Sequence, residues 1–253
     1  HLDCRRQRQM CIRDRLNMLT EEDLENNIAS NNNTVLALQH KVFNRSNISF
    51  LFINRESIKD YDFESENPYN RVIGIDYNLA SSDSRWEGKY YFHKSITPNL
   101  DSDDISAGFR TNYNSRNLNF KVGALYIGDN FNSDLGYIKR KSIYKIDPRI
   151  GYTFWPENKK ILNYEFEIAP FITWASDFNS LLSDYFIFTK WDVNFKSGIN
   201  FNISLRNQYT YLFDEFDPTG INNGNSLPAN SDYYYNNYEI EFNNYFSSSK
   251  FTY

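Results

Sequence analysis

Residues 199–212 read INFNISLRNQYTYL, and apolar and polar side chains alternate along almost the whole stretch. The apolar set is Ile199, Phe201, Ile203, Leu205, Tyr209 and Tyr211, and the polar set is Asn200, Asn202, Ser204, Arg206, Gln208 and Thr210. Successive side chains of a β-strand point to opposite faces of a sheet, so a period of two gives each set its own face. The stretch therefore predicts a β-strand with one apolar and one polar face.

The same alternation recurs along most of the chain from residue 34 onward. In 117–126, for example, Leu118, Phe120 and Val122 share one face, and Asn119 and Lys121 share the other. Strands are predicted near 34–43, 47–54, 70–80, 85–95, 105–113, 117–126, 142–154, 161–175, 184–195, 199–212 and 233–246, with another starting at 251. The fold class predicted from this pattern is all-β.

The connections between these predicted strands alternate in length. The short ones are 44–46, 81–84, 114–116, 155–160, 196–198 and 247–250, and the long ones are 55–69, 96–104, 127–141, 176–183 and 213–232. Tight turns at one end and long loops at the other are typical of an antiparallel up-and-down transmembrane β-barrel, whereas soluble sandwiches contain Greek-key crossings. Most strands also exceed the roughly nine tilted residues that cross a bilayer. We therefore expect such a barrel, with about 11–13 strands.

Composition narrows the class of protein further. The 253 residues include 4 Trp, 20 Tyr and 21 Phe, while the mean hydropathy is −0.67. Disordered chains lack aromatic residues, and helical membrane proteins need apolar runs of about 20 residues, which this sequence does not contain. The formal net charge of −5 gives no overall attraction to phosphate backbones, so we expect no nucleic-acid partner.

Aromatic residues gather near the ends of the predicted strands. Those beside short turns are Phe43, Trp86, Tyr113, Phe154, Trp155 and Phe195, and those toward the long loops are Phe92, Tyr126, Trp174 and Tyr211. Aromatic girdles at both membrane interfaces have this arrangement, although ordinary packing on a sheet gives the same residues.

The first fifteen residues, HLDCRRQRQMCIRDR, differ from the rest of the chain. They carry five arginines and both cysteines, Cys4 and Cys11. A basic arm or a metal or disulfide element is one interpretation, but two cysteines lack the number and spacing of a structural zinc site. The stretch RQRQMCIRDR resembles translated sequencing-adapter sequence. We therefore expect residues 1–15 to be a non-native segment without a part in the fold, and 16–253 to be the barrel fragment.

Four stretches carry a family resemblance: LALQHKVFNRSNISFLFINRES (36–57), NRVIGIDYNL (70–79), WEGKYYFHKS (86–95) and GDNFNSDLGYIKR (128–140). Together they resemble the family known as domain-of-unknown-function 5916, over about 16–253. Relatives often have Pro at the position of Ser133. The resemblance implies a Gram-negative outer-membrane β-barrel that follows a domain similar to family-9 carbohydrate-binding modules and continues beyond Tyr253. From the resemblance we therefore expect a truncated chain without that domain, and hence an incomplete, open barrel.

The resemblance also supplies the expected function. It implies an integral protein of the bacterial outer membrane, with the lipid bilayer as partner, linked to binding or handling of polysaccharide at the cell surface. Two other interpretations stay open: a cell-surface glycan hydrolase, and a soluble carbohydrate-binding β-protein. Likeness of fold alone is weak support for a function.

Pairs of carboxylates on predicted strands are the first candidates for chemistry. Glu165 with Glu167, and Glu239 with Glu241, are two residues apart and therefore share a face about 7 Å apart. Such a pair could serve as the acid and the base or nucleophile of a glycosidase. Charged residues that line a polar lumen fit the same pattern, and this second interpretation is favoured.

The remaining candidates lie mostly in predicted loops. A Ca²⁺ site would use Asp101, Asp103 and Asp104, but the Gly and distal Glu of an EF-hand loop are absent, which favours a solvated acidic loop. The histidines are His1, His40 and His93, too few for a histidine-rich metal site. Loop aromatics that could stack on sugar rings are Tyr61, Phe63, Tyr69, Phe213 and Phe216, with membrane-side or loop packing as the simpler explanation. No catalytic residue, cofactor or metal site is predicted.

Overall fold

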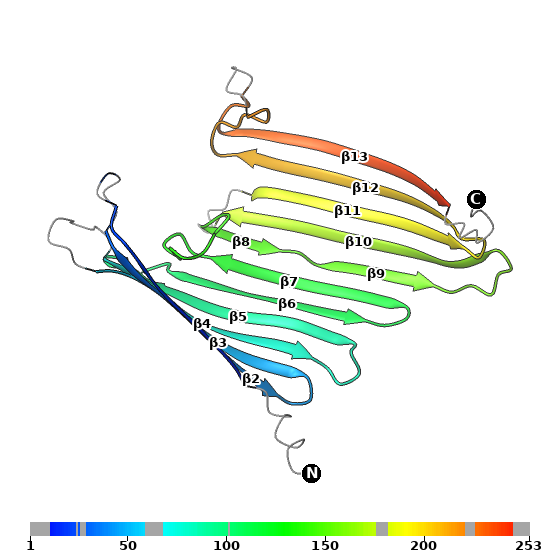
Figure 1. Cartoon of the computed structure of the whole chain (residues 1–253). Helices are drawn as coiled ribbons and strands as arrows, with labels where there is room; N and C mark the ends of the chain where they lie inside the picture. The colour runs from blue at the N-terminus through cyan, green and yellow to red at the C-terminus, as the bar shows by residue number, and fades with distance from the viewer. Residues whose placement is uncertain are drawn as a thin grey trace, which may run out of the picture. The chain divides into compact units, whose positions relative to one another are not determined.

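The computed structural model of the chain is built from β-strands (Figure 1). It describes residues 11–23, 25, 29–58, 68–100, 102–175, 182–220 and 226–244. These residues contain thirteen strands and no helix, and none of them forms a helix long and apolar enough to span a membrane. The strands are β1 (Cys11–Thr20), β2 (Asn31–Val42), β3 (Ser46–Ser57), β4 (Tyr69–Ala80), β5 (Trp86–Ile96), β6 (Ile105–Asn114), β7 (Leu118–Ile127), β8 (Ile143–Ile146), β9 (Arg149–Phe154), β10 (Ile161–Ala175), β11 (Leu182–Phe195), β12 (Ile199–Leu212) and β13 (Ser231–Asn244).

The strands form an antiparallel up-and-down sheet, as the sequence predicts. Hydrogen-bonded neighbours follow the order β1-β2-β3-β4-β5-β6-β7-β8-β10-β11-β12-β13, and β9 pairs with both β7 and β10. The predicted strand at 142–154 is two strands, because Asp147 and Pro148 separate β8 from β9 and proline cannot donate to a ladder. The strand expected from 251 lies outside the described residues.

Strand β1 differs from expectation. Its residues pair with β2 in an unbroken register from Cys11 opposite His40 to Thr20 opposite Asn31. Residues 11–15 are therefore part of the sheet, contrary to the expectation that residues 1–15 take no part in the fold. The backbone ladder makes most of this pairing. The Asn17 Nδ2 also donates to Asn32 Oδ1 at 2.8 Å and to Thr34 Oγ1 at 2.7 Å, and the side chains of 13–19 are exposed. Residues 1–10, with Cys4, lie outside the described residues, and the adapter origin of the segment stays a prediction.

The alternation of connection lengths is confirmed. Short connections at 43–45, 81–85, 115–117 and 196–198 alternate with long ones at 21–30, 58–68, 97–104, 128–142 and 213–230. The exception is the pair 155–160 and 176–181, which have the same length, and the short connection predicted at 247–250 lies outside the described residues. Tight turns need unusual backbone angles, which Phe43 at φ 54°, Ser84 at φ 60° and Gly198 at φ 86° supply in three of the short connections.

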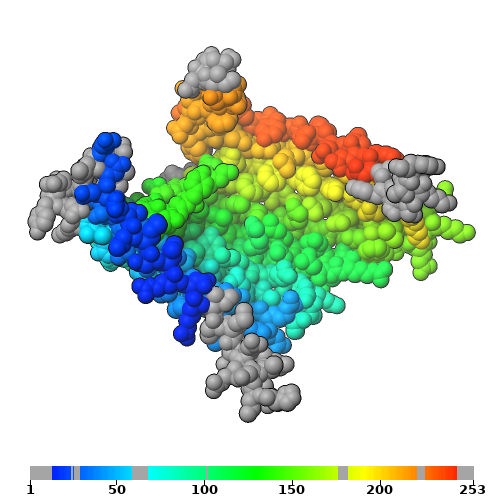
Figure 2. Space-filling model, viewed as in Figure 1, coloured from blue at the N-terminus to red at the C-terminus, as the bar shows by residue number. Residues whose placement is uncertain are grey.

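Contacts between residues divide the chain into two compact units. Unit 1 comprises His1–Thr111 and Gly123–Tyr144, and unit 2 comprises Asn112–Val122 and Lys145–Tyr253. Each unit is described by itself below. In unit 2, β10 to β13 are successive antiparallel neighbours, and their side chains form a continuous surface in the space-filling view (Figure 2).

Burial and polarity are reversed relative to a water-soluble protein. Among the described residues, twelve polar or charged side chains are buried but only six hydrophobic ones. On β12, Ile203 is 38% exposed while its neighbour Ser204 is 8% exposed. In unit 1, Ile75 is 54% exposed and Asn70 is 1% exposed. Each unit therefore has an exposed apolar face and a polar face on which side chains pack against one another, whereas soluble proteins bury their apolar residues.

Candidate functional site

The polar face of unit 2 carries rows of charged and amide side chains. Strand register aligns them across β10 to β13 in three successive rows. These are Asn163, Asn194, Asn200 and Asn243; Glu165, Asp192, Asn202 and Glu241; and Glu167, Lys190, Ser204 and Glu239. Because directly opposite residues on one face lie close together, each row is a continuous polar strip across four strands.

These side chains bond mainly to one another. The Asn202 Nδ2 donates to Glu241 Oε2 at 2.8 Å, and the Asn200 Nδ2 donates to Asp192 Oδ1 at 3.0 Å. Lys190 Nζ also lies 3.2 Å from an Asp192 oxygen. The rows on this face therefore form a network of amide, carboxylate and ammonium groups.

Both predicted carboxylate pairs lie on this polar face. Glu167 is ion-paired with Arg149, whose Nε lies 3.5 Å from Glu167 Oε1, and Glu241 accepts from Asn202. Glu165 packs beside Gly151 of β9, where a side chain larger than hydrogen would meet its Oε1. No group of three or more His, Cys, Asp or Glu residues suited to a metal ion occurs in the described part of the chain. The arrangement suits a hydrated polar lining.

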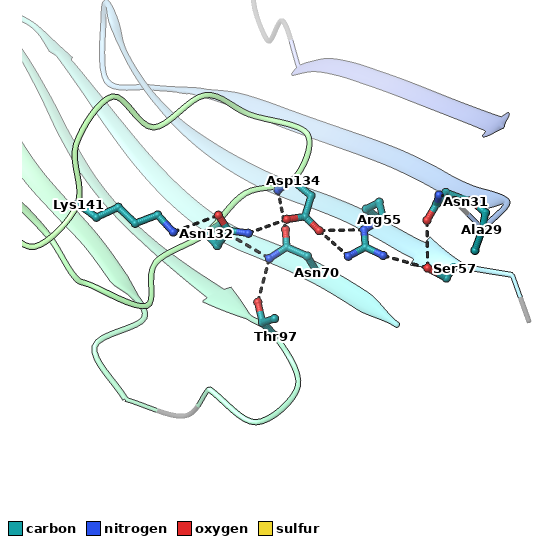
Figure 3. A network of polar contacts seen from close by, with 9 residues as sticks. All are labelled: Ala29, Asn31, Arg55, Ser57, Asn70, Thr97, Asn132, Asp134 and Lys141. Atoms are coloured by element: carbon teal, nitrogen blue, oxygen red, sulfur yellow. Dashed lines mark hydrogen bonds and ion pairs between the residues drawn. The ribbon is translucent and has the colours of Figure 1, made fainter. Parts of the chain in front are cut away.

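The polar face of unit 1 is covered in part by the long connection 128–142 (Figure 3). Asn70 is the centre of the contact: its Nδ2 donates to Thr97 Oγ1 at 3.0 Å and to the carbonyl of Asn132 at 3.2 Å. Its Oδ1 accepts from the backbone N–H of Asp134 at 3.0 Å. The side chain therefore binds the connection through both an N–H and a carbonyl of the backbone.

Two further contacts hold the same connection in place. The Arg55 guanidinium donates to Asp134 Oδ2 through Nε at 2.9 Å and Nη2 at 2.5 Å (Figure 3). On β5, the buried Ser95 accepts through Oγ from the backbone N–H of Asn132 at 3.1 Å. Phe131, which directly precedes Asn132, is buried. The connection 128–142 is therefore fixed on the polar face by charge, amide and hydroxyl contacts.

The described carboxylates of the predicted acidic loop bind other groups of the protein. Asp103 accepts from the Tyr126 hydroxyl and from the backbone N–H of Asp129, and the latter bond is 2.7 Å long. Asp104 is buried and accepts from Lys94 Nζ at 2.8 and 2.7 Å. Asp101 lies outside the described residues. The two described carboxylates thus anchor the start of β6 and the connection 128–142.

The histidines are not brought together. His93 Nε2 lies 2.8 Å from Asp76 Oδ1, and the imidazole occupies the space over Gly74 of the neighbouring strand. His40 lies on β2 opposite Ile48. His1 lies outside the described residues.

The described loop aromatics among the predicted candidates lie in both units, and each is described in its own surroundings. Tyr69 packs under the Arg71 guanidinium, whose carbon lies 4.5 Å from the ring centroid. In unit 2, Phe213 packs edge-on against Tyr211 with centroids 4.9 Å apart, and Phe216 is exposed. Tyr61 and Phe63 lie outside the described residues.

Sequence reasoning did not single out Asn70 or Ser95, and it noted Arg55 and Asp134 only within stretches that carry the resemblance. A polar residue at the start of an alternating strand was the available signal for Asn70.

Compared with models of known protein families and with curated proteins, the chain has no match.

Proposed function

We propose that the protein is an integral outer-membrane β-barrel protein whose apolar strand faces contact lipid and whose polar faces line the lumen. The observation that carries the proposal is the reversed burial described above. Lipid accepts the exposed apolar side chains, and the polar side chains then need partners only within the lumen.

The apolar stripe on β12 and β13 shows how much free energy the exposure of apolar side chains would cost in water. Ile203 lies opposite Ile240, Phe201 opposite Phe242 and Leu205 opposite Tyr238. On β13, Ile240 is 71% exposed and Phe242 is 66% exposed. Burial of such a side chain is worth about 1.5–3 kcal/mol, so a water-exposed row of them would be costly. A bilayer removes this cost.

Strand length and strand ends support the same proposal. Strands β10 to β13 have 15, 14, 14 and 14 residues, enough to cross a hydrocarbon core at a tilt. Trp86, Phe154 and Trp155 are exposed beside short connections. The indole N–H of Trp155 donates to the carbonyl of Arg116 at 3.1 Å, which fits an aromatic ring at the boundary between lipid and water.

Polysaccharide handling at the cell surface is the second part of the proposal. It is supported by the family resemblance and by a polar face rich in amide and carboxylate groups. Assays of the protein with purified polysaccharides, for both binding and cleavage, test it, and cleavage would favour the hydrolase interpretation instead.

The lipid-facing assignment is tested with arginine substitutions on the two faces of the paired strands β12 and β13. Ile203→Arg should destabilise the protein folded in detergent or vesicles by about 2–4 kcal/mol, because a cation on the lipid face near the midplane is costly. Glu239→Arg, at an exposed position on the polar face of the neighbouring β13, should cost much less, and Ile203→Leu should be tolerated. Ser204 does not suit this comparison, because its side chain is buried and lies opposite Lys190. Urea titration in lipid vesicles measures all three. Equal losses for the two arginine variants, or a folded chain that stays in solution without detergent, would contradict the proposal.

A further inference from the structure

Four side chains from four strands stack in a row on the polar face of unit 2. Lys145 Nζ of β8 lies 4.9 Å from the centroid of the Phe171 ring on β10. That ring stacks on Phe186 of β11, with centroids 4.8 Å apart and planes 6° apart. The Arg206 guanidinium of β12 lies 5.0 Å from the centroid of Phe186. We call these four residues the cation–ring stack.

Strand register assigns the cation–ring stack to the polar face. Phe171 lies directly opposite Phe186, four residues along β10 from Glu167 and therefore on the same side of the strand. Arg206 lies opposite Phe188, and its guanidinium is also 5.9 Å from that ring. These phenylalanines are exceptions to the polar lining, so they need an explanation other than contact with lipid.

The geometry shows what the rings do. Each ring face in the row is covered, by the other ring on one side and by a cation on the other, so a ligand cannot stack on Phe171 or Phe186. The rings instead fix the two cations, because a cation over an aromatic face gains about 0.5–2 kcal/mol. This contact positions the charges of Lys145 and Arg206 without neutralising them.

The two cations also differ from others on the polar face of unit 2. Within the described ranges, Lys190, Arg149 and Lys121 pair with carboxylates at 3.2, 3.5 and 3.1 Å, whereas Lys145 and Arg206 have no carboxylate within 4.0 Å. The acidic side chain two residues from Phe186 on β11, Asp184, accepts from the Ser183 hydroxyl at 3.0 Å. The positive charge of the stack is therefore available to an outside anion.

We propose that the cation–ring stack binds a ligand with at least two anionic groups, one for Arg206 and one for Lys145. Carboxylates and phosphates share the chemistry that a guanidinium and an ammonium recognise. The inference deepens the proposed function, on which its setting in a lumen rests. It specifies that the lumen binds acidic rather than neutral polysaccharide or phosphate chains.

Calorimetric titration of the detergent-folded protein with trigalacturonate, and separately with tripolyphosphate, tests the proposal and distinguishes the two anions. At least one should bind saturably, and binding should weaken as NaCl is raised. Arg206→Gln and Lys145→Gln should each lower the affinity about tenfold, since one charge-assisted contact is lost. Phe186→Leu retains both cations but removes a ring that fixes Arg206, and should lower the affinity less. Lys190→Gln, which removes a carboxylate-paired cation on the same face, should change it less than about twofold.

Absence of saturable binding of both probes to the folded wild-type protein would overturn the proposal. An affinity that is unchanged in both glutamine variants of the stack, or that falls equally in Lys190→Gln, would also overturn it. Failure of the Ile203 test in vesicles together with retained anion binding would instead refute the membrane location and leave the anion site standing.

Discussion

Replacement of Asn70 by alanine should release the connection 128–142 from the polar face of unit 1. The 1%-exposed amide makes three hydrogen bonds, to Thr97, to the Asn132 carbonyl and from the Asp134 N–H. Each such bond contributes about 0.5–1.5 kcal/mol net, and a buried group left without a partner costs more. Asn70→Ala should therefore lower the free energy of unfolding by about 2–4 kcal/mol.

Asn78→Ala is the matched control, because Asn78 lies on the same strand and face and its Nδ2 donates to Asn47 Oδ1 at 2.7 Å. It should cost about 1 kcal/mol. Urea titration measures both losses, and amide hydrogen exchange should rise over 128–142 in Asn70→Ala alone. If both variants lose the same stability and exchange in 128–142 stays slow, the anchoring role assigned to Asn70 is wrong.

Three other changes have defined outcomes. Gly128→Ala should cost about 1–3 kcal/mol in urea titration, because a Cβ there would overlap the carbonyl oxygen of Asp103 and overpacking forces a backbone shift. Asp134→Asn should speed protease cleavage within 128–142, because it removes the charge that Arg55 pairs with, and the difference from wild type should shrink at high salt. In the turn 81–85, hydrogen bonds, first from the Ser81 hydroxyl, hold the pKa of Asp83 below 3.8, so its contribution to stability is present above that pH and is lost as pH falls through the lowered pKa. A carboxyl NMR titration with a midpoint at or above 3.8 would contradict this assignment.

The strands were predictable because alternation is a local property of the sequence. Eleven predicted strands correspond to β2 to β13 within a few residues, with 142–154 divided at Pro148. Strand β1 was not predicted, because an edge strand bonds through its backbone and needs no particular side chains. Connection lengths then fixed the up-and-down order, since short turns join only antiparallel neighbours.

For the candidate site, the sequence predicted which residues share the polar face but not the contacts between them. Alternation placed Glu165, Glu167, Glu239 and Glu241 among polar neighbours, and their partners follow from register. Contacts such as Arg55 with Asp134 span 79 residues and depend on the path of a long connection, for which the sequence has no periodic signal. The same limit applies to the cation–ring stack, whose residues come from four strands.

Reversed burial also changes what stabilises such a protein. When apolar side chains stay at the surface, the packed interior consists of amides, hydroxyls and charges, and each of these must find a hydrogen-bonding partner. Among the described residues only two buried side-chain atoms lack one, Oδ1 of Asn33 and Oδ1 of Asn112. Directional contacts therefore take over the role that close apolar packing has in a soluble core. It follows that truncation of a buried polar side chain, such as Asn202, should disturb the fold more than truncation of its exposed apolar neighbour Ile203, the reverse of the order in a soluble protein.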